Sequence, residues 1–393
     1  MSKHWKRTLA LLAVAVAAGL ACGGLALGGK KPPAPPPPPQ PTISYSITFL
    51  GTLLGDTTSQ ARDVNEFGQV VGFSTGANGS RAFLYSVSDG MVALNDLIDP
   101  ASGWVLGWAT SINDAGQIVG LGKLNGQSRA YRFTPGVGEA PPVVEDLGTF
   151  GGGSEAYGIN AHGDVAGRST DFNGNLRAFV WTDQTGMVDI GDLGGGLAFA
   201  EGINNSGQVT GGSTIGATWL RAFRYTPGVG GLPGVMEDLG DLATLQSAAA
   251  RGLDINDHGH VVGYVDAGRF KGARYAHAFL YTDRMIDLGT LGGYHSEAYG
   301  LNSWGEVVGT SQVSTPDTTL HGFLYTNKTD TGGFVIVKLQ ERIVDLPGDF
   351  QAGILPRRIN DLGVICGSAG FADTWGQRWG TEAILLTPVT PQP

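Results

Sequence analysis

An eight-residue motif, Asn-x-x-Gly-x-(Val/Ile)-x-Gly, recurs along most of this chain and limits its fold more than any other feature. Its seven copies follow one another at intervals of 44 to 58 residues. Asn at the first position and Gly at the fourth are typical of a type I turn, because Asn bonds to the nearby backbone and Gly relaxes the exit. Each copy therefore predicts a hairpin turn between two strands. The copies begin at Asn65, Asn113, Asn160, Asn204, Asn256, Asn302 and Asn360.

Two further features repeat with the motif and supply the remaining strands. A pair of residues two apart, aromatic in six repeats, places both side chains on one face of a strand. The pairs are Phe83/Tyr85, Tyr131/Phe133, Phe179/Trp181, Phe223/Tyr225, Phe279/Tyr281, Phe323/Tyr325 and, without rings, Ala383/Leu385. Beyond the pair comes an Asp-Leu-Gly run, clearest at Asp146, Asp192, Asp238 and Asp287. Together these features predict four short strands in every repeat.

The last repeat lacks a fourth strand, and the start of the chain carries one strand too many. The last repeat ends near Leu386 without an Asp-Leu-Gly strand, whereas a spare strand, Ile47–Leu53, precedes the first turn. We therefore predict an all-β, seven-bladed β-propeller of four-stranded antiparallel blades, closed by the N-terminal strand completing the last blade. Closure removes exposed edges that promote aggregation. The alternative, an open β-solenoid, would need dissimilar caps rather than a complementary strand.

The first 42 residues are interpreted as a leader and a tether. Residues 1–21 have the basic start and short apolar core of a secretory signal peptide, too short for a permanent membrane span. Cys22 follows a lipobox-like Gly-Leu-Ala and is the candidate for lipidation, with cleavage after Ala17 as the competing interpretation. Residues 22–42 form the lipid-anchor candidate and linker, including the extended proline tract Lys30–Pro41. The propeller is expected over residues 43–388, followed by a tail at 389–393.

Composition narrows the classes of function. Glycine supplies 64 of the 393 residues while aromatic residues make up 9%, which indicates many tight turns rather than disorder. The net charge of −10 argues against nucleic acid and anionic lipid as partners, so membrane contact is expected only through Cys22. A signal peptide implies export across the inner membrane, to the cell surface, the outer membrane or the extracellular space. We expect a monomer.

Three of these features together resemble the HAF-repeat family of bacterial extracellular repeat proteins. They are His-Ala-Phe at His277, Asp-Leu-Gly-Thr-Leu-Gly-Gly from Asp287, and the Asn-x-x-Gly turn. The resemblance covers about residues 43–386 and implies a bacterial, extracellular repeat protein. It implies no catalytic residue. Four repeats depart from the pattern by carrying Arg in place of His, at Arg81, Arg129, Arg177 and Arg221.

Motifs associated with catalysis or metal binding have simpler explanations within the repeat. Gly72–Gly76 matches the Gly-x-Ser-x-Gly nucleophile elbow, but Gly-x-Ser recurs after other turns, so we expect a repeat feature. Asp171–Asn175 lacks the distant Glu of an EF-hand, and His258–His260 lies inside a turn without a third ligand. Cys366 occupies a position filled elsewhere by small residues and is expected in the core. No catalytic residue, metal or cofactor is predicted.

Two columns of charged residues also recur. One column is the Arg or His before the aromatic pair, and the other is the Asp of Asp-Leu-Gly. Because catalytic groups are rarely needed in six copies, we expect these residues to pair with each other or with backbone carbonyls in each blade. A ring of charges that binds an anion at the channel is the alternative.

Aromatic clusters at the places where the repeats break are the candidate ligand-binding residues. The connections before the first strand and between the second and third strands emerge on one face of a blade, and the clusters are assigned to those connections. Flat rings on one rim suit stacking on sugar rings or peptide side chains, whereas filling of gaps between blades is the alternative. The candidates are Trp104, Trp108, Tyr294, His295, Trp375, Arg378 and Trp379.

The sequence thus predicts a secreted or surface-tethered propeller that acts as a non-enzymatic binding module. The expected partner is a cell-envelope or extracellular glycan, or a surface protein. One alternative is a polysaccharide-acting enzyme, a lyase or glycosidase, on the same face; hydrolysis would need a pair of carboxylates there. A structural envelope protein is the other alternative. The carboxylates available on the rim are Asp266, Glu297, Asp317 and Asp373.

Overall fold

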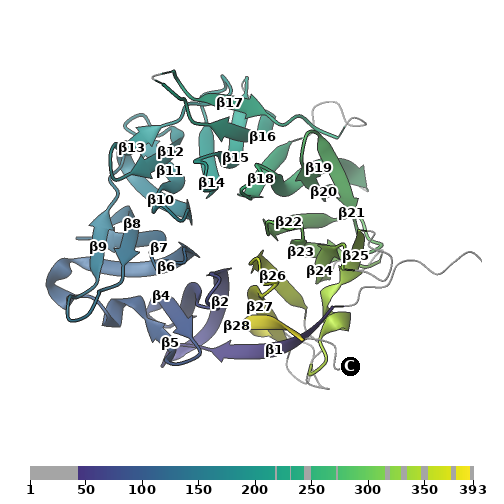
Figure 1. Ribbon diagram of the computed structural model, residues 1–393, viewed down its shortest axis with the longest axis horizontal. Helices are drawn as coiled ribbons and strands as arrows, with labels where there is room; N and C mark the ends of the chain where they lie inside the picture. Colours follow the sequence, from purple (N-terminus) through teal and green to yellow (C-terminus); the bar gives the residue numbers. More distant parts are fainter. Residues whose placement is uncertain are drawn as a thin grey trace, which may run out of the picture. The chain divides into compact units, whose positions relative to one another are not determined.

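Seven four-stranded antiparallel sheets are arranged in a ring in the computed structural model, and each sheet is one blade (Figure 1). The first strand of each blade lies nearest the centre of the ring and the fourth lies at its outer edge (Figure 1). The predicted seven-bladed β-propeller is confirmed. The predicted signal peptide, Cys22 and linker lie outside the described residues. These are 43–216, 219–230, 232–242, 249–270, 273–314, 319–328, 334–346, 353–372 and 378–389.

Each of the first four blades is continuous in sequence, and its strands are given from the centre outward. Blade 1 consists of β2 (Asp56–Val64), β3 (Val70–Gly76), β4 (Gly79–Ser86) and β5 (Gly90–Ala93). Blade 2 consists of β6 (Trp104–Ile112), β7 (Ile118–Leu124), β8 (Gln127–Thr134) and β9 (Val143–Asp146). Blade 3 consists of β10 (Gly151–Ile159), β11 (Val165–Asp171), β12 (Leu176–Thr182) and β13 (Gly186–Asp189). Blade 4 consists of β14 (Ala198–Ile203), β15 (Val209–Ile215), β16 (Trp219–Thr226) and β17 (Val235–Asp238).

The last three blades include the one that joins the two ends of the chain. Blade 5 consists of β18 (Ala250–Ile255), β19 (Val261–Phe270), β20 (Ala273–Tyr281) and β21 (Met285–Gly289). Blade 6 consists of β22 (Ser296–Leu301), β23 (Val307–Gln312), β24 (Leu320–Thr326) and β25 (Val335–Lys338). Blade 7 consists of β26 (Ile354–Ile359), β27 (Ile365–Ala372), β28 (Arg378–Val389) and β1 (Ser44–Gly51). Short 3-10 helices occur at Leu94–Asp96, Pro100–Ser102 and Leu339–Arg342. No helix in the described part of the chain is long and apolar enough to cross a membrane.

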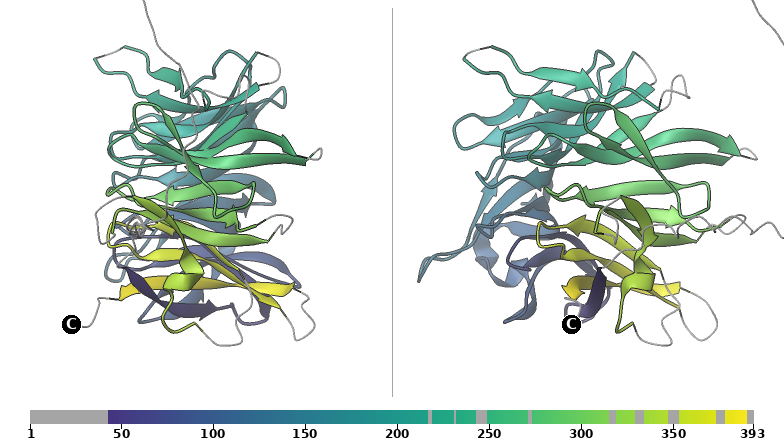
Figure 2. Two further views of the ribbon diagram at one scale, coloured as in Figure 1. Left: turned by 90° about the vertical axis from the view of Figure 1, so that its right-hand side faces the viewer. Right: turned by 45° about the vertical axis from the view of Figure 1, so that its right-hand side comes forward.

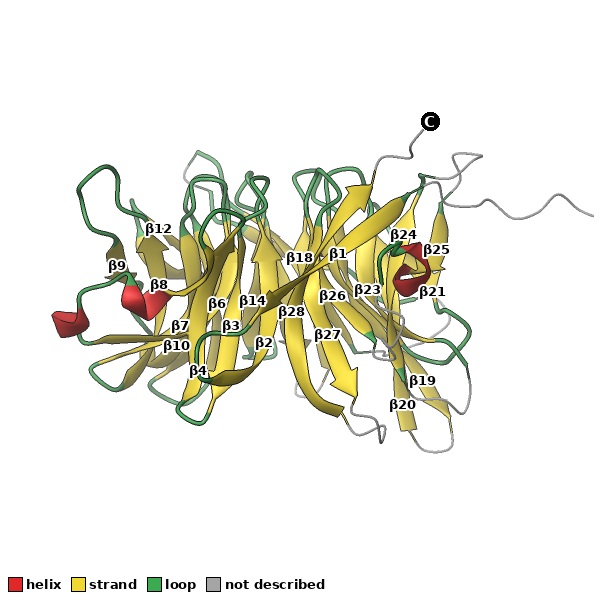
Figure 3. Ribbon diagram, turned by 90° about the horizontal axis from the view of Figure 1, so that it is seen from below, coloured by secondary structure: helices red, strands yellow, loops and turns green. Residues whose placement is uncertain are grey.

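The connections between strands gather on two opposite faces of the ring (Figures 2 and 3). Because neighbouring strands are antiparallel, the seven motif turns between first and second strands share one face, which we call the turn face. The opposite face, which we call the loop face, carries the connections between second and third strands and those between blades. The inner strands therefore run from the loop face to the turn face.

The ring closes as predicted. Strand β1 pairs antiparallel with β28, beginning with Ser44 opposite Val389, and so is the fourth strand of blade 7. Tyr45 of β1 is fully buried in a cluster that includes Ile384 and Leu386. This apolar seam joins the two ends of the chain and covers the edge of β28.

Each motif forms the predicted hairpin turn. In blade 1 the backbone N–H of Gly68 donates to the carbonyl of Asn65 at 3.1 Å. Asn65 Oδ1 also accepts from the backbone N–H groups of Phe67 and Gln69. The φ angle of Gly68 is +72°, and the equivalent glycine has a positive φ in all seven copies. Glycine adopts this conformation without strain, which explains the fourth position of the motif.

The Asn of each motif also joins its blade to the next. Its Nδ2 donates to the backbone carbonyl of the following motif's Asn at 2.9 to 3.2 Å in all seven blades. The last of these bonds runs from Asn360 to Asn65 and crosses the closure at 3.0 Å. All seven Asn residues are buried, so they form an unbroken circle of shielded hydrogen bonds around the channel.

The last Gly of the motif is explained by a close approach of the inner strand. A Cβ atom on Gly72 would lie 2.0 Å from the carbonyl oxygen of Gln60, and the equivalent distance is 1.9 to 2.3 Å in the other six blades. This approach occurs beside a β-bulge. In every blade the residue three before the motif's Asn has no partner in register on the second strand. Only glycine fits opposite such a backbone.

Each space between blades is filled by the first residue of the aromatic pairs. These six side chains are completely buried: Phe83, Tyr131, Phe179, Phe223, Phe279 and Phe323. In blade 7 the equivalent place is taken by Ile384, which lies opposite Gly367 as Phe83 lies opposite Gly72. The pair predicted at Ala383/Leu385 is therefore wrong by one residue, and the matching pair is Ile384/Leu386. Cys366 is fully buried, as predicted for a small core residue.

Substitution of Asn204 by Ala is expected to lower the free energy of unfolding by about 2–4 kcal/mol, since four hydrogen bonds are lost. Its Nδ2 donates to the Asn256 carbonyl and to Gln208, and its Oδ1 accepts two backbone N–H groups. Urea denaturation measures the change. Ser206→Ala, at an exposed position of the same turn, is the control and should change stability by less than about 0.5 kcal/mol. Equal effects of the two substitutions would contradict the role given to Asn204.

Candidate functional site

A cavity of about 390 Å³ lies within the central channel, and we call it the central pocket. Its walls come from the inner strands of all seven blades, with one residue from β19. The volume is within the range of small-molecule sites. The pocket is lined by Arg62, Trp108, Thr110, Tyr157, Glu201, Arg251, Leu253, Tyr264, Glu297, Tyr299, Arg357 and Arg358.

The β-bulges place one residue from every blade in this pocket. A bulge re-aims the side chain of its extra residue, here toward the channel. The seven bulge residues are Arg62, Thr110, Tyr157, Glu201, Leu253, Tyr299 and Arg357. The motif beside them is constant, whereas these residues vary in size and charge. None of the seven was among the candidate ligand-binding residues predicted from the sequence.

Glu297 is the most extensively bonded carboxylate of the pocket. It accepts a hydrogen bond from Tyr299 Oη at 2.6 Å, and its other oxygen lies 3.2 Å from His295 Nε2. His295 Nδ1 accepts from the backbone N–H of Ala276, so the ring hydrogen of the neutral imidazole lies on Nε2, toward Glu297. Burial alone would raise the pKa of Glu297, but the hydrogen bonds from His295 and Tyr299 outweigh it and hold the pKa low.

Two further glutamates are paired in the same way. Glu201 forms an ion pair with Arg251, which lines the pocket from the next blade. Glu155 lies on β10 and accepts hydrogen bonds from Tyr157 Oη and from Arg168, the latter at 2.6 Å. Glu155, Glu201 and Glu297 are therefore fixed anions with partners of their own.

The arginines of the pocket fall into two groups. Arg251 and Arg358 form ion pairs, whereas Arg62 and Arg357 form none with any residue that the structure describes. Burial, and then the charge of Arg357, lower the pKa of Arg62 to about 10, so Arg62 remains a cation at neutral pH. The pocket has an excess of positive charge, although the whole chain is acidic.

An ion-paired arginine forms the floor of the pocket on the side of the turn face. Arg358 Nη1 lies 2.8 Å from Asp254 and also donates to the carbonyl of Tyr299, while Arg358 Nε lies 3.9 Å from Asp63. Arg358 also lines a second cavity of about 240 Å³, which the motif turns surround. Burial raises the pKa of Asp254 to about 6, against the opposing effect of Arg358.

The prediction that Trp104 and Trp108 lie in a connection before the inner strand is wrong. Both belong to β6 itself, because this strand continues to Trp104 by pairing with β7 across two irregularities. Trp104 is partly buried and lies edge-on to Tyr131, which is the gap-filling role named as the alternative. Trp108 instead lines the central pocket, with 39% of its surface exposed, and stacks on Phe73 at 4.8 Å.

The other predicted site residues are described only in part. Tyr294 and His295 lie in the connection before β22, as predicted, and the Tyr294 ring lies 5.6 Å from that of Tyr275. Trp375 lies outside the described residues. Arg378 and Trp379 begin β28, and the structure describes their backbone. Of the rim carboxylates, Glu297 reaches the pocket, Asp266 lies on β19, and Asp317 and Asp373 lie outside the described residues.

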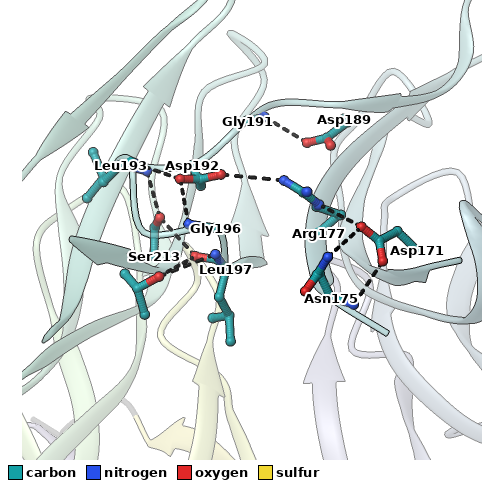
Figure 4. A network of polar contacts seen from close by, with 12 residues as sticks. Asp171, Asn175, Arg177, Asp189, Gly191, Asp192, Leu193, Gly196, Leu197 and Ser213 are labelled. Atoms are coloured by element: carbon teal, nitrogen blue, oxygen red, sulfur yellow. Dashed lines mark hydrogen bonds and ion pairs between the residues drawn. The ribbon is translucent and has the colours of Figure 1, made fainter. Parts of the chain in front are cut away.

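The predicted pairing of the charged columns is present in four blades. The pairs are Arg129–Asp146 at 3.4 Å, Arg177–Asp192 at 3.5 Å, Arg221–Asp238 at 3.9 Å and His277–Asp287 at 2.8 Å. In Figure 4 Arg177 bridges Asp171 and Asp192, and Ser213 Oγ accepts the backbone N–H of Leu193 at 2.9 Å. Ser74, Ser169 and Ser311 accept equivalent bonds, so the Gly-x-Ser serines are a repeat feature, as predicted.

The described residues contain no group of three or more His, Cys, Asp or Glu side chains that could hold a metal ion. What the central pocket offers is an arrangement of aromatic rings, paired glutamates and two cations without carboxylate partners. Such a site can bind a ring-shaped polar molecule by stacking and hydrogen bonding.

The raised pKa of Asp254 gives a signed prediction for pH. The folded state holds the proton of the Asp254 carboxyl group more tightly than the unfolded chain does. The contribution of this protonated group to stability is therefore full below about pH 4 and is lost as pH rises through about 6. The free energy of unfolding of the wild type should therefore fall, relative to that of Asp254→Asn, between pH 4 and 7. Denaturation curves across this range measure the difference. Parallel pH profiles for the two proteins would contradict the assignment.

Comparisons with known proteins relate the chain to others through its fold. No family model matches the sequence, and no curated protein matches it. A streptogramin B lyase is similar with a TM-score of 0.50 and 12% identity, over 88% of this chain and 98% of the lyase. An oligogalacturonate lyase from Vibrio parahaemolyticus has a TM-score of 0.45 and 9% identity, over 88% of this chain and 91% of its own. A fungal alcohol oxidase in complex with copper has a TM-score of 0.47 and 14% identity, over 88% of this chain and 76% of the oxidase. At 12% identity the likeness to the streptogramin B lyase shows a shared fold and transfers no activity.

Proposed function

We propose that this protein is a non-enzymatic binding module and that the central pocket is its ligand site. The observation that carries the proposal is the state of the pocket's carboxylates. Glu201 and Glu297 line the pocket, Glu155 lies beside it, and each is held by an arginine, tyrosine or histidine. Fixed anions of this kind orient neighbouring donors and shape a site for recognition.

The same observation places the enzymatic alternative second. Glycoside hydrolysis needs one carboxyl group that donates a proton and another that acts as base or nucleophile. A lyase needs a base that is free to take a proton from its substrate. Among the described residues, Glu297 has a lowered pKa and both oxygens occupied, and His295 Nδ1 is occupied by a backbone N–H. These groups are poorly suited to proton transfer.

The aromatic side chains of the pocket favour a ligand that contains a ring. Trp108 is held by stacking on Phe73, so its exposed face is pre-organised and loses little conformational freedom on binding. Tyr157, Tyr264 and Tyr299 supply further ring surface on the other sides. Sugars match this combination of flat apolar faces and polar edges, and an envelope or extracellular glycan remains the ligand class that we propose.

The cellular setting belongs to the same proposal. The basic and apolar residues of 1–21, the Cys22 lipobox and the proline tract support export and tethering at the bacterial surface. The resemblance to HAF-repeat proteins agrees with this setting. In the described part of the chain, β1 begins on the turn face, whereas the pocket lies toward the loop face beyond Arg358.

Substitution of Trp108 by Ala is expected to weaken ligand binding by roughly tenfold or more, because a rigid ring is removed from the pocket. A glycan array with the full-length protein identifies ligands, and calorimetry measures their affinity. Trp219→Ala is the matched control, since Trp219 is exposed at the start of β16, outside the pocket.

A double variant of Trp375 and Trp379 tests the predicted rim site in the same experiment. Loss of binding in that variant, with full binding by Trp108→Ala, would move the site from the pocket to the rim. Turnover of a bound glycan would contradict a non-enzymatic role. A protein that binds no glycan would favour the structural alternative.

A further inference from the structure

Two arginines of the central pocket differ from every other arginine that faces the channel. Arg62 is the bulge residue of β2, and Arg357 is the bulge residue of β26, in the neighbouring blade across the closure. Neither has a carboxylate within ion-pair distance among the described residues. Arg251 and Arg358, in contrast, have such partners in Glu201 and Asp254. The two bulges therefore bring two cations without ion-pair partners to one wall of the pocket.

Both guanidinium groups lie against aromatic rings. Arg62 lies over Phe73 at 5.2 Å and over Trp108 at 5.7 Å, and Arg357 lies over Tyr299 at 4.3 Å. The N–H donors of a guanidinium group lie in its plane and point outward from its edge. Because neither group forms an ion pair with a described residue, these donors can bond an acceptor in the pocket. Arg62 Nε is buried and has no hydrogen-bond partner in the structure.

This arrangement is costly in the absence of a ligand. Two like charges repel, and the effect is stronger in a partly buried site than in water. The lowered pKa of Arg62 reflects burial and the charge of Arg357. A buried donor without an acceptor adds a further cost. A bound anion would remove all of these penalties at once, which gives the pocket a preference that a neutral ligand cannot satisfy.

We infer that Arg62 and Arg357 form a clamp for the carboxylate of an acidic sugar or a similar carboxylated ring, whose ring lies against Trp108. The inference rests on the proposed function and adds the charge of the ligand. A carboxylate is planar and matches the edge of a guanidinium group with two parallel hydrogen bonds. The ring then contacts the exposed face of Trp108, which already supports Arg62. The ligand thus spans the cationic and the aromatic sides of the pocket.

The test uses the full-length protein and three probes that differ at one carbon: glucose, glucuronic acid and glucose 6-phosphate. Calorimetry gives the affinity for each probe. Glucuronic acid is expected to bind roughly tenfold or more tightly than glucose, through the charge-assisted bonds. Arg62→Gln and Arg357→Gln should each abolish this preference, by lowering the affinity for glucuronic acid far more than the affinity for glucose. Arg62→Lys should restore it only in part, because lysine keeps the charge without the fork.

Arg284→Gln is the matched control, because Arg284 is exposed between β20 and β21 on the turn face. It should leave every affinity unchanged. Equal binding of glucuronic acid and glucose would overturn the clamp while the proposed binding function survived. Tighter binding of glucose 6-phosphate than of glucuronic acid would overturn the assignment to a carboxylate. A lack of binding by all three probes would overturn the inference together with the proposed sugar site. If an arginine variant fails to fold, the affinities of the wild type for the three probes still test the clamp.

Discussion

The hydrogen bond from each motif Asn to the carbonyl of the next motif Asn is the interaction on which the rest of this propeller depends. One side chain performs two tasks, since its Oδ1 fixes the turn of its own blade and its Nδ2 reaches the neighbouring blade. The geometry of the turn and the spacing of the blades are therefore set together. The seventh bond, from Asn360 to Asn65, closes the circle between segments 295 residues apart in sequence. Strand β1 closes the outer edge of the same blade through its pairing with β28.

The last glycine of the motif connects this architecture to the pocket. It gives the inner strand room to bulge, and the bulge turns one side chain per blade into the channel. The chain can change that residue without disturbing the turn, the circle of Asn residues or the core. The repeated motif thus determines the fold, and the seven variable bulge residues determine the chemistry of the pocket. The excess of cations arises there, at Arg62 and Arg357, within an acidic protein.

Much of this fold could be predicted from the sequence because the constraints are local and repeated. The Asn–Gly spacing fixes a turn, the aromatic pairs mark the core, and the spare strand at Ile47–Leu53 identifies the closure. The pocket was harder to predict, because strict alternation along a strand does not reveal a bulge. A signal was present nonetheless. Buried positions fall four and one residues before each Asn, as at Ala61 and Val64, which leaves two successive residues outside the core.

The candidate aromatic residues were predicted only in part, because the sequence does not show the details of strand pairing. Trp108 was a candidate because it interrupts the repeat, yet its place in a strand rather than a loop depends on where β6 begins. That boundary is set by pairing with β7, which is a tertiary effect. Arg62 and Arg357 looked ordinary in sequence, since arginines elsewhere in the chain form ion pairs. Only the positions of the neighbouring carboxylates show that these two have none in the described part of the chain.

The central claim is that the circle of Asn bonds makes seven blades one cooperative unit. Native-state hydrogen exchange tests it most directly, because it reports the free energy of opening for amides in each inner strand separately. The account predicts one common opening free energy for β2, β6, β10, β14, β18, β22 and β26, equal to that of global unfolding. A lower opening free energy confined to β26 and β2, at the seam between the ends of the chain, would contradict it. That result would mean that the ring opens at its closure as an array of separate repeats.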